Sequence, residues 1–235
     1  MYLAERVNRK LQNSELHQYV GKKLTTRQLR KILNSEFKSL GVRACIIPDS
    51  NMMRAKNRKD IFHIGGEYSP GKKSIPITLN VCVSPTRKSM ILGKIKMERL
   101  LFKIAQTVQH EKIHKMQDKR HPDIDSSYPV EFLKFSDSRD TVAGSKERLQ
   151  EMKYLGDHGE VDPYAHDIAM EIKYYYPHMD VREAIKNIGS LKKVQAYQYY
   201  RRTFKGTNWD VLRKTLLRKI WKWLPQVIPP QPLAA

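Results

Sequence analysis

The chain has 235 residues, of which 40% are hydrophobic, and its formal net charge at pH 7 is +20. This length and apolar content predict a folded protein with its own core and exclude a disordered basic tail. Lys and Arg interrupt every apolar stretch, so we expect no transmembrane segment, and the start of the chain lacks the apolar core of a signal peptide. We therefore expect the chain to be made in a reducing cytoplasm.

The first 42 residues predict two helices. A charged amphipathic pattern covers roughly residues 3–19. The second helix is expected to begin with Thr25 or Thr26 as its N-cap and to end at Gly41. Its apolar positions follow helical spacing and are Leu29, Ile32, Leu33, Phe37 and Leu40.

Three short strands are predicted next, at residues 43–47, 61–68 and 75–83. Their sequential order favours an antiparallel meander. Pro76 suggests that the third strand begins at a sheet edge, since proline cannot donate a ladder hydrogen bond. The pair Gly65-Gly66 in the middle strand predicts a bulge or a turn.

A long helix is expected between Met90 and Lys119. Its buried stripe is spaced by four, three and four residues and consists of Met97, Leu101, Ile104 and Val108. Residues 121–141 are rich in Pro, Ser and Asp and are interpreted as a loop. A short helix over 145–154 should follow.

Another helix is predicted from near Glu160 to Pro177, and further helices fill the basic C-terminal part as far as residue 224. The expected fold class is α+β, with a small antiparallel sheet packed on the long helix in a zincin-like way. The expected organisation has N-terminal helices in 1–42, a metallopeptidase-like core in 43–177, and a basic helical region with a Pro-rich tail in 178–235.

The long helix carries the motif HExxH as His110-Glu111-Lys112-Ile113-His114. At ~100° per residue, the two histidines lie about 40° apart around the axis and one turn apart along it, so both imidazoles can reach one metal ion. Glu111 lies about 60° beyond His114, where it can contact a water at that metal without binding the metal. Two imidazoles and a nearby carboxylate in this pattern indicate zinc-dependent hydrolysis, with Glu111 as general base.

A zinc site of this kind needs a third protein ligand. Metzincins supply a histidine six residues after the second histidine, following a glycine, but this chain has Arg120 and Gln117 at those positions. Gluzincins supply a glutamate from a later helix, and Glu160 is placed for that role. The rival candidates are Asp157, His158 and Asp162.

The segment HEKIHKMQ, followed by YLGDHGEVDPYAHDIAMEI, resembles small metallopeptidase-like proteins encoded by tailed bacteriophages. Those proteins are similar to minimal gluzincins, with a short sheet, the HExxH helix, and a helix that opens with the glutamate ligand. The resemblance covers roughly residues 61–175. It implies that His110, His114 and Glu160 bind zinc and that Glu111 is the base.

Two further residues are candidates for supporting the metal ligands. Tyr164 stands where many gluzincins place an acid that supports a ligand histidine, so this chain departs from the pattern there. His166 lies one turn after Asp162. That pair either supports the site or forms a solvated i, i+4 hydrogen bond.

The positive charge is concentrated in residues 182–222, which hold twelve basic side chains and two acidic ones, Glu183 and Asp210. Such an excess calls for a negative partner, which could be nucleic-acid phosphates, an anionic membrane or an acidic neighbouring protein. Interleaved aromatic residues are typical of surfaces that follow a phosphate backbone and stack bases. The expected nucleic-acid-binding residues are Lys192, Lys193, Arg201, Arg202, Lys205, Arg213, Lys214, Arg218 and Lys219.

The sequence thus leads to three alternative functions. The first is a zinc-dependent, gluzincin-like metallopeptidase of a tailed phage, made in the host cytoplasm and associated with the virion. An extended peptide substrate would then add to the strand at 75–83. The second is an inactive structural part of the particle, at a collar, vertex or tail junction, with other virion proteins as partners. The third is a non-specific DNA-binding protein.

Overall fold

The computed structural model describes residues 3–50, 61–70, 76–120 and 145–231. The loop expected at 121–141 lies outside these ranges. The chain forms two compact units, Met1–Lys115 with Pro229–Ala235 (unit 1) and Met116–Ile228 (unit 2). The division falls within one continuous helix. The three-part organisation expected from composition is a different division and stays a prediction.

Unit 1 is the α+β part of the chain. Its elements are α1 (Leu3–Gln12), β1 (Lys23–Thr25), α2 (Thr26–Phe37), β2 (Val42–Pro48), β3 (His63–Tyr68), β4 (Ile77–Val83), β5 (Ser89–Ile91) and α4 (Lys94–Arg120), whose last turn belongs to unit 2. Short 3-10 turns follow α1, at Glu15–Tyr19, and α2, at Lys38–Leu40. The predicted 3–19 helix is therefore divided in two.

The second helix begins where its sequence predicts but ends at Phe37, and a 3-10 turn continues the chain to Gly41. The Thr25 hydroxyl accepts a hydrogen bond from Gln28 N at 3.1 Å, and the Gln28 side chain accepts one from Thr25 N at 2.9 Å. This reciprocal pair is a capping box. The chain leaves the following 3-10 turn through Gly41, whose φ of 72° favours glycine.

The three predicted strands form one sheet, but its topology is not the expected meander. The order is β2-β4-β3, with β4 antiparallel to β3 and parallel to β2. The expectation that the third strand begins at an edge is also wrong, because β4 is central and Pro76 precedes its first paired residue. Buried side chains alternate along β4 and are Ile77, Leu79, Val81 and Val83. The central position buries this apolar strand more fully than an edge would.

Two features of the sheet edges matter for the site. The Asn34 side chain of α2 donates to Ala44 O at 3.0 Å and accepts from Ala44 N at 2.9 Å, so it occupies part of the outer edge of β2. Gly65 and Gly66 pair in regular register with Asn80 and Leu79. The predicted bulge or turn at this glycine pair is therefore wrong, and β3 runs straight through it.

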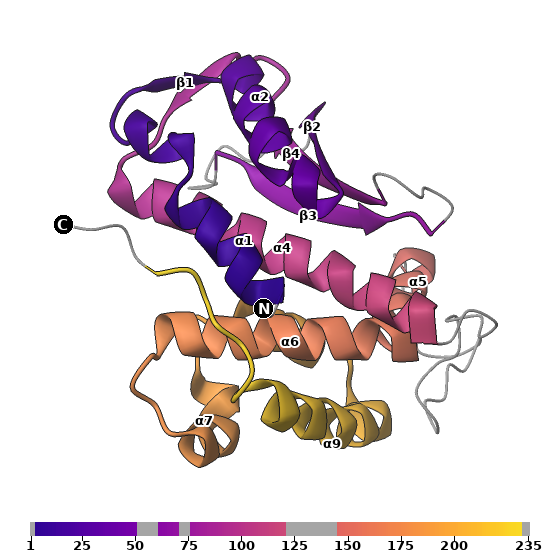
Figure 1. Ribbon diagram of the computed structural model, residues 1–235. Coiled ribbons are helices and arrows are strands. Elements are labelled where there is room, and N and C mark those ends of the chain that lie inside the picture. The colour runs from indigo at the N-terminus through magenta and orange to yellow at the C-terminus, as the bar shows by residue number, and fades with distance from the viewer. Residues whose placement is uncertain (1–2, 51–60, 71–75, 121–144, 232–235) are drawn as a thin grey trace. The chain divides into compact units, whose positions relative to one another are not determined.

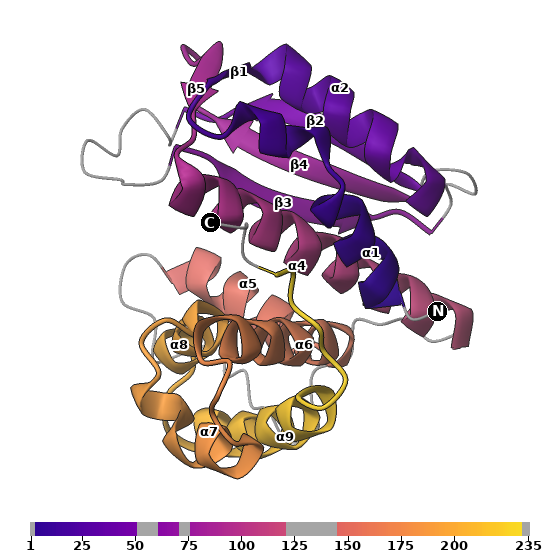
Figure 2. The same cartoon turned by 60° about the vertical axis from the view of Figure 1, so that its left-hand side comes forward.

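Helices cover both faces of the sheet. Figures 1 and 2 both show α2 on one face and α4 on the other. The stripe predicted for α4 is buried, with Met97, Leu101, Ile104 and Val108 each at most 5% exposed. A second, two-stranded sheet joins β1 to β5, with Leu24 opposite Met90. Its strands are too short to show a period in the sequence.

Unit 2 is a helical assembly around one central helix. Besides the end of α4 it contains α5 (Ser145–Leu155), α6 (His158–Tyr175), α7 (Val181–Asn187), α8 (Gln195–Thr203) and α9 (Gly206–Trp223). Helix α6 packs against α8 and α9 (Figure 2). Tyr200 of α8 donates its hydroxyl to Leu155 O at 2.9 Å. The Glu171 carboxylate of α6 accepts from Ala196 N at 2.9 Å and so caps the start of α8. Within the described ranges, no helix is long and apolar enough to cross a membrane.

Candidate metal centre

His110 and His114 lie one turn apart on α4, as the motif predicts. Their ring centroids are 5.0 Å apart with an interplanar angle of 62°. His110 is 8% exposed, whereas His114 is half-buried. The two imidazoles therefore form an adjacent pair, of which the second is open to solvent.

Glu111 is buried, at 6% exposure, on the side of α4 that faces the sheet. A Cβ placed on Gly66 of β3 would lie 2.6 Å from Glu111 Cγ, Glu111 Oε1 and Thr107 Cγ2. The same addition at Gly65 would meet nothing within 4 Å. Gly66 thus leaves the space that the Glu111 carboxylate occupies.

The surroundings of Lys112, which lies between the two histidines in sequence, disfavour its charged form. Lys112 is 9% exposed, and its burial, with Arg6 and Lys115 nearby, lowers its pKa to about 8. Loss of hydration is the main cause, because burial destabilises the charged ammonium more than the neutral amine.

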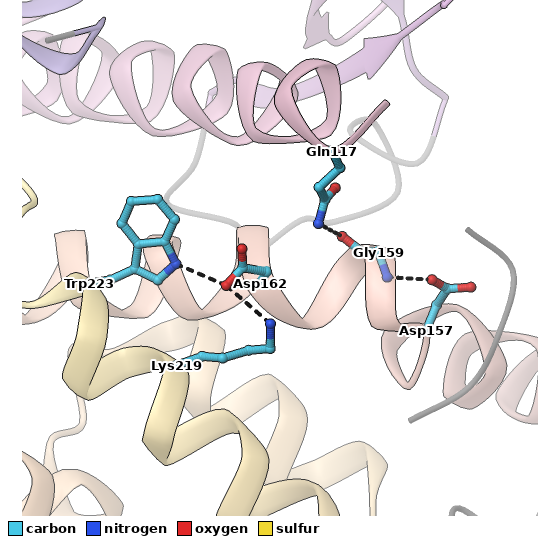
Figure 3. A network of polar contacts seen from close by, with 6 residues as sticks. All are labelled: Gln117, Asp157, Gly159, Asp162, Lys219 and Trp223. Carbon is cyan, nitrogen blue, oxygen red and sulfur yellow. Dashed lines mark hydrogen bonds and ion pairs between the residues drawn. The ribbon is translucent and has the colours of Figure 1, made fainter. Parts of the chain in front are cut away.

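Glu160 lies in the first turn of α6, and the start of that helix is well defined. The Asp157 carboxylate accepts from Gly159 N at 2.6 Å and is the N-cap. Pro163 stands inside the helix and has no N–H to donate to Gly159 O, four residues earlier. Gln117, on the last turn of α4, donates to that carbonyl at 3.0 Å (Figure 3). Proline in α6 therefore frees the acceptor that joins α6 to the end of α4.

Three tyrosines of unit 2 lie near Glu160 and contact one another. Tyr154 is hydrogen-bonded to the side chains of Glu160 and Tyr164. Ring contacts connect Tyr154 to Tyr164 at 6.4 Å and Tyr164 to Tyr200 at 5.4 Å. Burial is the largest cause that raises the pKa of Tyr164 and Tyr200, and the Glu160 charge adds to it. They therefore remain neutral hydrogen-bond donors at neutral pH.

Tyr154 is the neighbour of Glu160 that the sequence analysis missed. It lies six residues before Glu160, at the end of α5, in the YLGDHGE segment, and its side chain is 50% exposed. Tyr164, the residue singled out instead, shares its hydrogen bond with Tyr154.

Three other candidate residues, Asp162, His158 and His166, lie on α6 and differ in their contacts and exposure. The Asp162 carboxylate accepts from Trp223 Nε1 at 3.2 Å and pairs with Lys219 Nζ at 3.3 Å (Figure 3). His158 is exposed. His166 is buried, with its ring edge-to-face with that of Trp223 at 5.1 Å and its Nδ1 3.6 Å from Asp167 Oδ1.

The residues expected to bind nucleic acid all lie in unit 2, and most are exposed there. Lys219 is the least exposed of them and forms an ion pair with Asp162. Arg201 donates to Gly189 O at 3.1 Å, and Lys193 Nζ lies 5.9 Å from the centre of the Tyr175 ring. The other expected residues are also exposed and are Lys192, Arg202, Lys205, Arg213, Lys214 and Arg218.

Within the described ranges, His110, His114 and Glu160 form a group that could hold a metal ion. Each offers one ligand atom, and these atoms lie within 4.8 Å of one another. Comparisons with protein-family models, with curated proteins and with solved structures found no match for this chain. The chemistry of the group must therefore be argued from its own residues.

Proposed function

We propose that the protein is a zinc-dependent peptidase in which His110, His114 and Glu160 hold the metal and Glu111 is the general base. The observation that carries the proposal is the grouping of two imidazoles and one carboxylate within 4.8 Å. Catalytic zinc sites take three protein ligands of this kind and leave a fourth position open.

The donor set fits zinc in number and in type. Imidazole nitrogens and carboxylate oxygens are both ordinary zinc ligands, and three of them leave a fourth position for water. Calcium and magnesium prefer oxygen donors throughout and fit two imidazoles poorly. The hydrogen bond from Tyr154 would orient the Glu160 carboxylate, as outer partners of metal ligands do.

The anchoring of the helices also favours Glu160 as the third ligand. Helix α4 is continuous from Lys94 to Arg120, and His110, His114 and Gln117 share one face of it. Gln117 is bonded to Gly159, the residue immediately before Glu160. This hydrogen bond joins the start of α6 to the last turn of α4.

Glu111 supplies the proton chemistry. When bound, zinc acidifies a water and polarises the carbonyl of a peptide bond. Glu111 would accept a proton from the attacking water at a carboxylate oxygen and pass it to the leaving amine as the C–N bond breaks. Its burial against Gly66 limits the positions of that carboxylate and excludes bulk water from it.

An extended peptide would bind along β3 rather than along the strand at 75–83. The earlier expectation is wrong because β4 is paired on both sides, with β2 and with β3. Among the described strands β3 pairs with β4 alone, so its other edge can accept an added strand. Gly66, whose lack of a side chain leaves space for Glu111, lies on this strand.

The setting of this activity in a tailed-phage particle belongs to the same proposal. It is supported by the resemblance of residues 61–175 to phage metallopeptidase-like proteins, carried by HEKIHKMQ and the Tyr154–Ile172 segment. The +20 charge suits a place beside packaged DNA or an acidic neighbour.

Zinc titration of single variants tests the ligand set. We expect wild type to bind one Zn²⁺, and His114→Ala and Glu160→Ala to weaken binding by more than the ~10–100-fold that loss of an outer hydrogen bond costs. Isothermal titration calorimetry at neutral pH measures the number of Zn²⁺ ions bound and the dissociation constant for each variant. His158→Ala is the matched control, because this exposed residue of the same helix was a rival ligand and should leave affinity unchanged. If His158→Ala weakens zinc binding and Glu160→Ala does not, the ligand set is wrong.

A further inference from the structure

Helix α9 has two faces of opposite character. Its apolar face is fully buried in unit 2 and consists of Leu212, Leu216 and Ile220. Lys214, Arg218 and Lys222 recur at the same four-residue spacing on the opposite face and are all exposed. At 1.5 Å per residue, these three side chains mark a line about 12 Å long. We call them the α9 cationic row.

The charge of the row is only slightly compensated by its own helix. Asp210 stands four residues before Lys214 and is the one acid of α9. The positions four residues to either side of Arg218 and Lys222 carry Lys, Arg or Gln. Lys219, by contrast, points to Asp162 and is paired with it at 3.3 Å (Figure 3). The row therefore presents positive charge to solvent, whereas the charge of Lys219 is balanced by Asp162.

An exposed indole lies beside the row. Trp221 is adjacent in sequence to Lys222 and three residues after Arg218, and it is 47% exposed. An aromatic plane next to cations is the arrangement with which proteins stack a base while they hold the neighbouring phosphates.

A membrane surface fits this helix less well than a nucleic acid does. Interfacial helices bind membranes by inserting a free apolar face into the lipid. In α9 that face is already used by the core of unit 2, and Trp221 is the one large apolar side chain of the helix that is strongly exposed. Phosphate contact and stacking need only what the outer face offers.

We propose that the α9 cationic row binds the phosphate backbone of single-stranded nucleic acid without reading its sequence, and that Trp221 stacks on an unpaired base. The site is independent of the metal-binding residues. Three phosphate contacts to a single strand give a slope of about −2 in a plot of log K against log salt concentration, which means roughly 20-fold weaker binding at 200 mM than at 50 mM salt.

Fluorescence anisotropy with a labelled oligothymidylate and the full chain tests the proposal. The triple variant Lys214→Gln, Arg218→Gln, Lys222→Gln should lose most of the affinity and most of the salt dependence. The matched control is Arg27→Gln, Arg30→Gln, Lys31→Gln, which removes three exposed cations of α2 and the same net charge. The control should retain wild-type binding apart from a small uniform loss. Equal loss in both triple variants would mean that binding follows net charge alone and would overturn the proposal.

The stacking part has its own readout. Trp221→Ala should weaken binding by roughly five-fold or more, whereas Trp221→Phe keeps an aromatic plane and should lose less. Equal affinity of wild type and Trp221→Ala would overturn the stacking. Binding of wild type to vesicles of phosphatidylserine and phosphatidylcholine, without binding to the oligonucleotide, would overturn the choice of partner. Circular dichroism melting confirms that each variant is folded.

Discussion

Glu111→Gln is expected to lower kcat/KM for peptide hydrolysis by at least about 10²–10⁴-fold, the usual contribution of a positioned general base. The amide has nearly the shape of the carboxylate, so the buried site beside β3 stays filled, but it cannot accept the proton of the attacking water. Because Glu111 is not a proposed ligand, zinc affinity should change little. Rates on a fluorogenic peptide library, with zinc affinity measured in parallel, check both statements.

Glu98→Gln is the control for that experiment, since it makes the same change on the same helix, about three and a half turns away from Glu111. It should leave both the rate and zinc affinity unchanged. Chelator-sensitive hydrolysis that survives in Glu111→Gln would contradict the assigned base. Loss of zinc in Glu111→Gln would instead place this residue among the ligands.

Gly66→Ala is expected to impair the same chemistry from the sheet side. The new methyl group would lie 2.6 Å from Glu111 Cγ, Glu111 Oε1 and Thr107 Cγ2. Thr107 is β-branched and stiff, so the Glu111 side chain must move to another rotamer. Overpacking of this kind costs about 1–3 kcal/mol of stability. Activity should fall at least about ten-fold, because a misplaced base loses its hydrogen-bond geometry.

Gly65→Ala is the matched control for Gly66→Ala, because it adds the same methyl group one residue earlier in β3, where nothing lies within 4 Å. Replacing a strand glycine by alanine should leave the free energy of unfolding unchanged or raise it by about 0.5–1 kcal/mol. Thermal melting and hydrolysis rates of the pair separate the two positions. Similar losses in both variants would mean that the glycine pair, and not the space beside Glu111, matters.

Local signals in the sequence predicted the elements well, because helix caps and apolar spacing act over a few residues. Thr25 begins a helix, and Gly41 ends the turn that follows it, where the sequence places them. The four-three-four spacing of apolar residues likewise located the buried stripe of α4. These features depend only on contacts within one turn.

The sheet order could not be predicted in the same way. Pairing of β4 with both β2 and β3 depends on contacts between segments far apart in sequence, and Pro76 gave a misleading local signal because it falls just outside the ladder. Gly66 was misinterpreted for the same reason. Its small size is explained by Glu111, which only folding brings beside it.

The candidate site was predicted in part. HExxH identifies His110, Glu111 and His114 from helical geometry alone, whereas a third ligand on another helix needs the fold. Tyr154 and the Lys219–Asp162 ion pair escaped because each contact joins different helices. The function of Pro163, which frees Gly159 O for Gln117, is visible in sequence only once the partner helix is known.

X-ray absorption at the zinc edge, on the zinc-loaded full chain, tests the central claim most directly. The account predicts two imidazole nitrogens at about 2.0–2.1 Å and one carboxylate oxygen at about 2.0–2.2 Å, with the oxygen contribution from Glu160 lost in Glu160→Ala. A spectrum without imidazole scattering, or one that Glu160→Ala leaves unchanged, would contradict it.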